Sequence, residues 1–119
     1  MATVNGIGAW EAKGVHSKTW SSLASGDSGD WFSAGSLPDK TIHVFGTFDT
    51  GTVTIQGSNT ATAGGSPVTL TDQSDNDLAL TAAAAEVVVQ NTRWIRPLLS
   101  GGAGSMDITV VLLSRADLA

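Results

Sequence analysis

The sequence predicts an all-β protein: an antiparallel β-sandwich or small barrel of roughly seven to nine short strands. Within residues 40–58, apolar and hydroxyl side chains alternate with the period of two that a half-buried sheet requires. Turn residues recur about every ten positions along the chain. Fourteen glycines and only 14% charged residues are typical of a turn-rich β protein rather than a helical bundle.

Length and composition limit the classes of function. The 119 residues suffice for one domain with a single core, and they contain no cysteine for a disulfide or a thiolate metal site. A net charge of -5 argues against nucleic acid as a partner, because phosphate binding needs clustered cations. No apolar run approaches the roughly 18 residues that span a bilayer, so we expect no membrane association.

Residues 1–16 are expected to form an extended N-terminal arm, and residues 17–119 a single β-sandwich domain. In the arm, Val4, Ile7 and Trp10 are apolar without clear periodicity, and glycines interrupt them. Because such side chains avoid water, the arm should pack along its own domain or reach onto a neighbour. The arm lacks the basic and apolar regions of a secretory signal, so we expect the protein to stay where it is made or to join an assembly there.

The first predicted strand covers residues 17–24, with Trp20 on one face and Leu23 on the other. Residues 25–39 have the Gly, Ser, Asp and Pro density of a long loop, although two large aromatic residues lie in its middle. This aromatic pair is expected either to plug one end of the sandwich or to anchor a partner surface.

Two alternating strands follow in residues 40–58, joined by a turn at 49–51. Residues such as Ile42 and Val53 fall on the apolar sides of these strands, and threonines take the opposite sides. One face of each strand should therefore be buried, while the hydroxyl-rich face is presented to solvent or to a partner.

The middle of the chain is predicted to form short strands between polar turns. A turn at 59–67 precedes a strand at 68–71, in which Val68 and Leu70 are expected to point inward. A further strand is predicted at 78–81. Single short segments of this kind need neighbouring strands for stability.

The last third of the chain is the most apolar part. Residues 86–90 are predicted to form a strand that is apolar on both faces, and Pro97 makes 93–99 an edge strand or a bulge because it cannot donate to a ladder. The final strand, 105–114, is also apolar on both faces. Its second face should therefore be covered by the N-terminal arm or by another subunit.

No motif in the sequence indicates catalytic or metal chemistry. Residues 26–29 spell the GDSG core found around the nucleophile of trypsin-like serine proteases, but the one acid between His16 and the serine belongs to the motif itself, and the chain is too short for two barrels. The acidic stretch 72–77 lacks EF-hand spacing, and His16 and His43 are too few for a zinc site. We therefore expect no catalytic residue, no metal, no cofactor and no small-molecule substrate, and predict that the protein is not an enzyme.

Four tryptophans without a tyrosine suggest carbohydrate binding, since indole rings stack on sugars. No two tryptophans are spaced at i, i+2 to form a flat platform, so packing is the preferred interpretation of each. Arg93 and Arg96 flank Trp94 on one predicted strand, a combination suited to an interface. The alternative is local: one arginine pairs within its own sheet and the other is solvated.

Four segments together resemble a family of small tailed-phage virion proteins. They are Phe48–Asn59, Val68–Asp72, Trp94–Gly102 and Ile108–Leu113, within a match that covers about residues 40–115. The resemblance implies a jelly-roll-like head decoration or cement protein on the outside of an icosahedral capsid, usually trimeric. A tail or baseplate component of the same virion, or a carbohydrate-binding or adhesion module, is the alternative function.

The resemblance also implies partners and contact residues. The partners would be the major capsid protein and two further copies of this chain, at the capsid surface of a virion assembled in the host cytoplasm. Capsid contacts would come from the arm and the aromatic loop, namely Val4, Ile7, Trp10, Trp31 and Phe32. Subunit contacts would come from Arg93, Trp94, Arg96, Val111 and Leu113.

Overall fold

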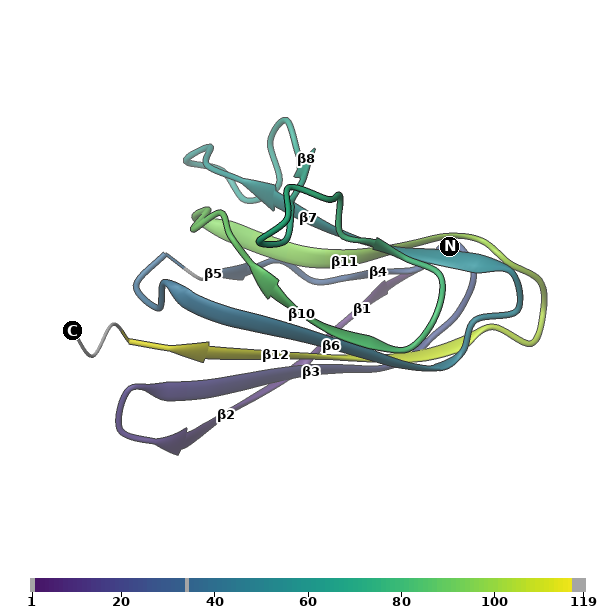
Figure 1. The fold of residues 1–119 in the computed structure, drawn as a ribbon, viewed down its shortest axis with the longest axis horizontal. Helices are drawn as coiled ribbons and strands as arrows, with labels where there is room; N and C mark the ends of the chain where they lie inside the picture. Colours follow the sequence, from purple (N-terminus) through teal and green to yellow (C-terminus); the bar gives the residue numbers. More distant parts are fainter. Residues whose placement is uncertain (1, 34, 117–119) are drawn as a thin grey trace.

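Two β-sheets pack face to face in the computed structural model, which describes residues 2–33 and 35–116 (Figure 1). Residues 117–119 of the predicted domain lie outside this range. The all-β sandwich predicted from the sequence is confirmed. None of the described segments is a helix long and apolar enough to cross a bilayer.

The larger sheet has seven strands: β1 (Thr3–Val4), β4 (Ser28–Gly29), β5 (Phe32–Ser33), β7 (Gly51–Ser58), β8 (Val68–Thr69), β9 (Ala79–Leu80) and β11 (Trp94–Gly101). Its order is β1-β4-β11-β7-β8, with β5 also paired to β11 and β9 to β7. The five-stranded sheet contains β10 (Ala84–Val88), β6 (Asp39–Thr47), β12 (Asp107–Arg115), β3 (Val15–Leu23) and β2 (Ile7–Ala12), in that order. Only the β1–β4 pair among the described strands is parallel.

Seven of the described strands are longer than two residues, in agreement with the predicted number. The five others, β1, β4, β5, β8 and β9, are two-residue pairings inside stretches rich in turn residues. One detail of these stretches was predicted wrongly: Leu70 is buried as expected, but Val68 is 57% exposed. It lies at the border of the seven-stranded sheet, where no second layer covers it.

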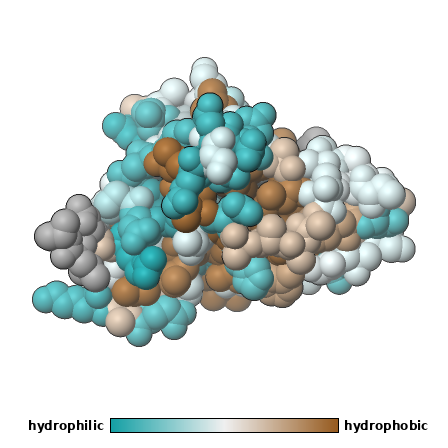
Figure 2. Space-filling view, viewed as in Figure 1, coloured by the Kyte–Doolittle hydropathy of each residue, from teal (hydrophilic) through white to brown (hydrophobic). Residues whose placement is uncertain are grey.

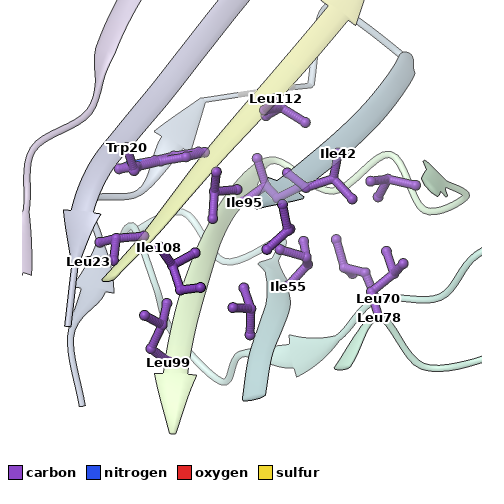
Figure 3. Packing of buried hydrophobic residues seen from close by; sticks show 14 of the residues in the cluster. Trp20, Leu23, Ile42, Ile55, Leu70, Leu78, Ile95, Leu99, Ile108 and Leu112 are labelled. Atoms are coloured by element: carbon purple, nitrogen blue, oxygen red, sulfur yellow. The ribbon is translucent and has the colours of Figure 1, made fainter. Parts of the chain in front are cut away.

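The core lies between the two sheets and is built from alternate residues of the long strands (Figure 3). Trp20 is its largest member and is fully buried. The cluster comprises Trp20, Leu23, Ile42, Val44, Val53, Ile55, Leu70, Leu78, Val88, Ile95, Leu99, Met106, Ile108, Val110 and Leu112.

Strands β6 and β7 alternate as predicted, but they do not form a hairpin. Ile42 on β6 and Val53 on β7 are buried, which confirms the predicted apolar sides. However, β6 belongs to the five-stranded sheet and β7 to the seven-stranded sheet. Asp49 and Thr50 adopt positive φ values of 48° and 64°, and the chain crosses at this point from one layer to the other.

Trp20 and Leu23 on β3 were expected on opposite faces, and this expectation was wrong. Both are fully buried. The register against β12 shifts between Val110, which pairs with Trp20, and Ile108, which pairs with Leu23. Two residues of β3 therefore oppose one residue of β12, and this β-bulge, with Ser22 at a φ of 57°, turns both side chains inward.

The described part of the predicted N-terminal arm is not separate from the sandwich. Residues 3–4 form β1 at the edge of the seven-stranded sheet, and residues 7–12 form β2 at the edge of the five-stranded sheet (Figure 1). Strand β3 begins at Val15, so the boundary expected after residue 16 falls within a strand. The segment thus crosses one open side of the sandwich and adds a strand to each layer.

Two aspartates attach this N-terminal segment to the rest of the sandwich, one just before β4 and one between β4 and β5. Asp27 accepts the backbone N–H of Ala2 at 3.0 Å. Asp30 accepts the N–H of Gly6 and the indole N–H of Trp20, both at 2.8 Å, and forms an ion pair with Lys18 at 3.1 Å. Partial burial acts to raise the pKa of the Asp30 carboxyl, but these hydrogen bonds and the nearby ammonium outweigh it, so the pKa lies below its ordinary value.

Pro97 was predicted to place its strand at an edge or a bulge, and this prediction was wrong. Its strand, β11, lies inside the seven-stranded sheet, between β7 and the short strands β4 and β5. Pro97 faces Ile55 on the neighbouring strand β7. The N–H of Ile55 donates to the carbonyl of Leu78, and the carbonyl of Ile55 accepts the N–H of Leu70, so both groups point away from Pro97. On its other side Pro97 faces the break between β4 and β5, so its missing N–H removes no ladder hydrogen bond.

Lys40 is a buried charged residue. Only 1% of it is exposed, so its ammonium group lies inside the protein. Its Nζ donates to the carbonyl of Leu37 at 3.1 Å and to Oδ1 of Asn91 at 2.6 Å. Burial lowers the pKa of Lys40, and the charge of Asp39 opposes this effect only in part. The folded state therefore binds this proton less tightly than the unfolded chain does.

We expect the free energy of unfolding to rise as the pH is raised from the depressed pKa of Lys40 towards its ordinary value of 10.5, because the cost of the buried charge disappears. Urea denaturation between pH 8 and about 10.4 measures this rise. The rise should be smaller in Lys40→Met, and unchanged in Lys13→Met, whose lysine is exposed. Equal slopes in all three proteins would contradict this assignment.

Candidate functional site

The outward side of the five-stranded sheet carries apolar side chains interspersed with hydroxyl groups. On the central strand β12, Val111 and Leu113 point outward, because the alternate residues Val110 and Leu112 are in the core. Pairing with β12, β3 and β6 places residues of the neighbouring strands on the same side. We call the apolar members of this side the apolar outer face: Ile7, Ala9, Phe45, Ala85, Val87, Val111 and Leu113. Polar side chains lie between them, because Thr19 and His43 flank Val111, and Ser17 and Thr41 flank Leu113.

The residues of the apolar outer face differ in exposure within one subunit, and Val87, Val111 and Leu113 are half-buried. Ile7 is 78% exposed and Phe45 39% exposed. Charged groups lie at its margin, where Arg115 and Asp39 form an ion pair at 3.3 Å. Figure 2 shows hydrophobic and hydrophilic residues mixed along the lower border of the molecule, where this sheet runs in Figure 1. Partly exposed apolar side chains with charges at the margin also occur in protein interfaces.

The outward side of the seven-stranded sheet is different in character. Trp94 and Arg96 project from β11 beside the threonine-rich side of β7. The Arg96 guanidinium lies 4.4 Å from the ring centre of Trp31, and its Nε donates to Oε1 of Gln56 at 3.0 Å. Burial lowers the pKa of Arg96, which stays charged in any accessible pH range. Arg96 therefore pairs within its own subunit, whereas Arg93 is exposed.

The two groups of expected subunit-contact residues thus lie on different surfaces. Arg93, Trp94 and Arg96 belong to the seven-stranded sheet, and Val111 and Leu113 to the apolar outer face. One patch cannot contain both groups. They can meet only if unlike surfaces of two copies come into contact, as in a head-to-tail arrangement.

The expected capsid-contact residues also separate. Val4 and Phe32 are half-buried against the core, and Phe32 stacks on His16 with ring centres 5.1 Å apart. The ring of Trp10 contacts the His16 ring edge-on, with ring centres 5.0 Å apart, and Trp10 is 67% exposed. Trp31 is partly covered by Arg96. Of this group, only Ile7 and Trp10 present most of their side chain to solvent.

The four tryptophans do not form a sugar-binding platform. Trp20 is in the core, Trp31 stacks with Arg96, and the indole N–H of Trp94 donates to the carbonyl of Thr60 at 3.0 Å. Trp10 is the one tryptophan ring that is mostly exposed. The packing role expected for the tryptophans is thus confirmed for Trp20 and wrong for Trp10.

The motifs weighed for chemistry have structural roles. Ser28 of the GDSG segment is buried and pairs with Leu98 on β11. Asp72 accepts the backbone N–H groups of Ser74 at 2.8 Å and Asn76 at 3.0 Å, which is the Asx-type turn expected there. Within residues 2–33 and 35–116, no group of three or more His, Cys, Asp or Glu side chains could hold a metal ion.

One cavity was not foreseen from the sequence. It has a volume of about 420 Å³ and lies where β7 ends, beneath the loop that leads to β8. Thr92 closes it from the segment between β10 and β11, more than thirty positions from β7 in the chain. No local pattern could have indicated it, because its walls come from segments that only the fold brings together. The lining residues are Gly57, Ser58, Asn59, Thr60, Gly65, Ser66, Val68 and Thr92.

No protein-family model matches the sequence, and no curated protein does. Solved structures do match. The SPBc2 prophage-derived protein YomS superposes with a TM-score of 0.60 at 13% identity, covering 84% of this chain and 93% of YomS. A cupin domain from Bordetella pertussis Tohama I gives a TM-score of 0.52 at 12% identity, covering 98% of this chain and 99% of the domain. At such identities the likeness shows a shared fold alone, which fits the jelly-roll-like sandwich.

Proposed function

We propose that this protein is a non-enzymatic structural component of a virion, which decorates and stabilises the outside of an icosahedral phage capsid as a homotrimer. The observation that carries the proposal is the apolar outer face. It is centred on an interior strand of the sheet, so the fold of one subunit leaves it uncovered. A protein that remains in solution alone gains nothing from such a face, whereas an assembly buries it.

Two further points support a virion component over other classes. YomS, which shares the sandwich over most of both chains, is itself derived from a prophage. The second match is a cupin domain, but a sandwich fold hosts many unrelated functions and does not select one. A sandwich with a single packed core suits a protein that clamps a shell, and three linked copies gain avidity on a capsid.

In this proposal Val111 and Leu113 lie in the contact between subunits, and the partner of the trimer is the major capsid protein. Ile7, at the edge of the apolar outer face, is the best exposed residue for contact with that partner. The half-buried Val4, Phe32 and Trp31 support the capsid-contact region around Ile7 rather than supply most of its contact area.

The native mass of the purified protein tests the trimer. We expect a particle of three 12.1 kDa chains at micromolar concentration. Val111→Lys and Leu113→Lys should each shift this particle towards the monomer, because a charge would be buried without a partner. Ser100→Lys, on the far end of β11 in the other sheet, is the matched control and should stay trimeric.

Binding to expanded capsids of the phage that encodes the protein tests the location. Sedimentation with capsids, followed by electron microscopy, should place the protein on the shell. A wild-type protein that is monomeric and does not sediment with capsids would overturn the proposal. Labelling of the tail or baseplate in intact virions would overturn the capsid location and favour the tail alternative.

A further inference from the structure

The cavity beneath the loop after β7 is built to accept an apolar group. The hydroxyls of Ser58, Thr60 and Thr92 each donate to a backbone carbonyl of their own subunit, so they offer little to a polar ligand. The side-chain oxygen of Asn59 accepts the N–H of Arg93 at 2.8 Å. Methyl and methylene groups therefore form the accessible wall, with the exposed Val68 beside it.

The shape of this cavity is fixed by close contacts. A Cβ on Gly57 would lie 2.5 Å from Oγ1 of Thr92, so the floor admits only glycine. A Cβ on Gly65 would lie 2.6 Å from Oγ1 of Thr60, which also accepts the Gly65 N–H at 3.1 Å. A preformed apolar cavity of this size can hold one large side chain of a partner, and such filled pockets are where interface energy concentrates.

The chain itself presents a side chain of the right kind. All six residues of β2 are exposed, and Trp10 is the largest side chain on it. Within its own subunit Trp10 contacts His16 of the five-stranded sheet, whereas the cavity belongs to the seven-stranded sheet. In Figure 1 the β2–β3 turn and the end of β7 lie on opposite layers of the sandwich. Trp10 can therefore reach such a cavity only in another copy.

Charge complementarity favours a second copy as the occupant. Glu11 follows Trp10 and is exposed, and Arg93 adjoins the lining residues Asn59 and Thr92 and is exposed as well. Among residues 2–33 and 35–116 the ion pairs are Lys18–Asp30 and Arg115–Asp39, so neither Glu11 nor Arg93 has an ionic partner in this part of its own subunit. Glu11 accepts a hydrogen bond from the hydroxyl of Ser17 at 2.6 Å. A Trp10 side chain in the cavity would bring Glu11 towards Arg93.

We propose that Trp10 of one subunit inserts into this cavity of the next subunit, with Glu11 pairing with Arg93 at its rim. The inference rests on the proposed homotrimer and names one of its contacts. Trp10 is thereby assigned to the contact between subunits, although it was expected to contact the capsid. Because knob and cavity are unlike surfaces, the contact is head-to-tail and closes into a ring of three when each step turns by a third of a circle.

Charge reversal provides the main test. Glu11→Arg and Arg93→Glu should each raise the dissociation constant of the trimer by about tenfold or more, since like charges would face each other. The double variant should regain most of the wild-type affinity. Lys13→Glu, in the β2–β3 turn, changes net charge as Arg93→Glu does and should leave the affinity unchanged. Trp10→Ala should weaken the trimer by about thirtyfold or more.

Cross-linking provides a second measurement that does not depend on affinity. The chain has no cysteine, so Trp10→Cys combined with Val68→Cys introduces the only reactive pair. A short bismaleimide should join subunits of this double variant into covalent dimers and trimers, and should not join either single variant. A stable wild-type trimer with additive charge reversals and no cross-link would overturn this contact and leave the proposed function standing. A wild-type monomer would overturn both.

Discussion

Replacing Asp30 with alanine should lower the free energy of unfolding by about 3 kcal/mol, because one carboxylate holds three donors. Its Oδ1 accepts the N–H of Gly6 and the indole N–H of Trp20, and its Oδ2 accepts Lys18. Without Asp30, the indole N–H of a fully buried ring and an ammonium that is 12% exposed both lose their acceptor. The attachment of the N-terminal segment to the sandwich weakens at the same time.

Urea denaturation of the wild type and the variant measures this loss. Asp107→Ala is the matched control: this aspartate is exposed at the start of β12, and its removal should change the free energy of unfolding by less than about 0.5 kcal/mol. A loss below about 1 kcal/mol in Asp30→Ala would show that the three hydrogen bonds do not act together as described.

The contribution of Asp30 should also depend on pH. The pKa of Asp30 is lower in the folded protein than its ordinary value of 3.8, so the folded state favours the ionised form. The stabilisation is complete above pH 3.8 and is lost as the pH falls through the depressed folded-state pKa. The difference in unfolding free energy between wild type and Asp30→Ala should therefore be constant near neutral pH and shrink in strong acid.

Replacing Gly46 with alanine should cost about 3 kcal/mol, from backbone strain and from a steric clash together. Gly46 has a φ of +127°, which side-chain-bearing residues rarely adopt. A Cβ at this position would collide with the carbonyl oxygen of Asp107 and lie 3.2 Å from Cα of Ile108. Both atoms belong to the backbone of β12, which pairs with β6 here and cannot move aside without breaking the ladder.

Thermal and urea unfolding of Gly46→Ala measure this cost. Gly104→Ala is the control, because a Cβ there would meet no atom within 4 Å and its φ is outside the positive range. It should be neutral or slightly stabilising, since alanine reduces the freedom of the unfolded chain. If Gly46→Ala and Gly104→Ala unfold alike, the chain at Gly46 adopts a different conformation from the one described.

Much of the fold follows from the local pattern of residues. Alternation identified β6 and β7 and their buried sides, and the two-sided apolar character of residues 105–114 indicated a strand covered on both faces. Strand β12 is the centre of the five-stranded sheet, but the N-terminal segment pairs beside β3 as β2 and does not cover the outward side of β12. Cover by another subunit stays a prediction. Each of these features needs only the period of two of a single strand.

The pattern did not predict which strands pair. Asp49 and Thr50 were expected to close a hairpin, yet they carry the chain between layers. Pro97 was expected at an edge, yet a break in its neighbours admits it inside a sheet. Trp20 was placed on its face by simple alternation, and the bulge opposite Thr109 changed the register beyond it. Each correction arises from a partner strand that is distant in sequence.

By itself, the sequence determined the all-β class, the sides of the long strands that are buried, and the presence of an apolar surface beyond the needs of one core. The tertiary structure alone decided that apolar residues of four strands share one side of a sheet, that Asp30 ties the N-terminal segment to Trp20, and that a cavity forms beside Arg93. The reason is physical: alternation fixes where a side chain points relative to its own strand, whereas faces, cavities and hydrogen-bonded clusters depend on which strands lie beside it.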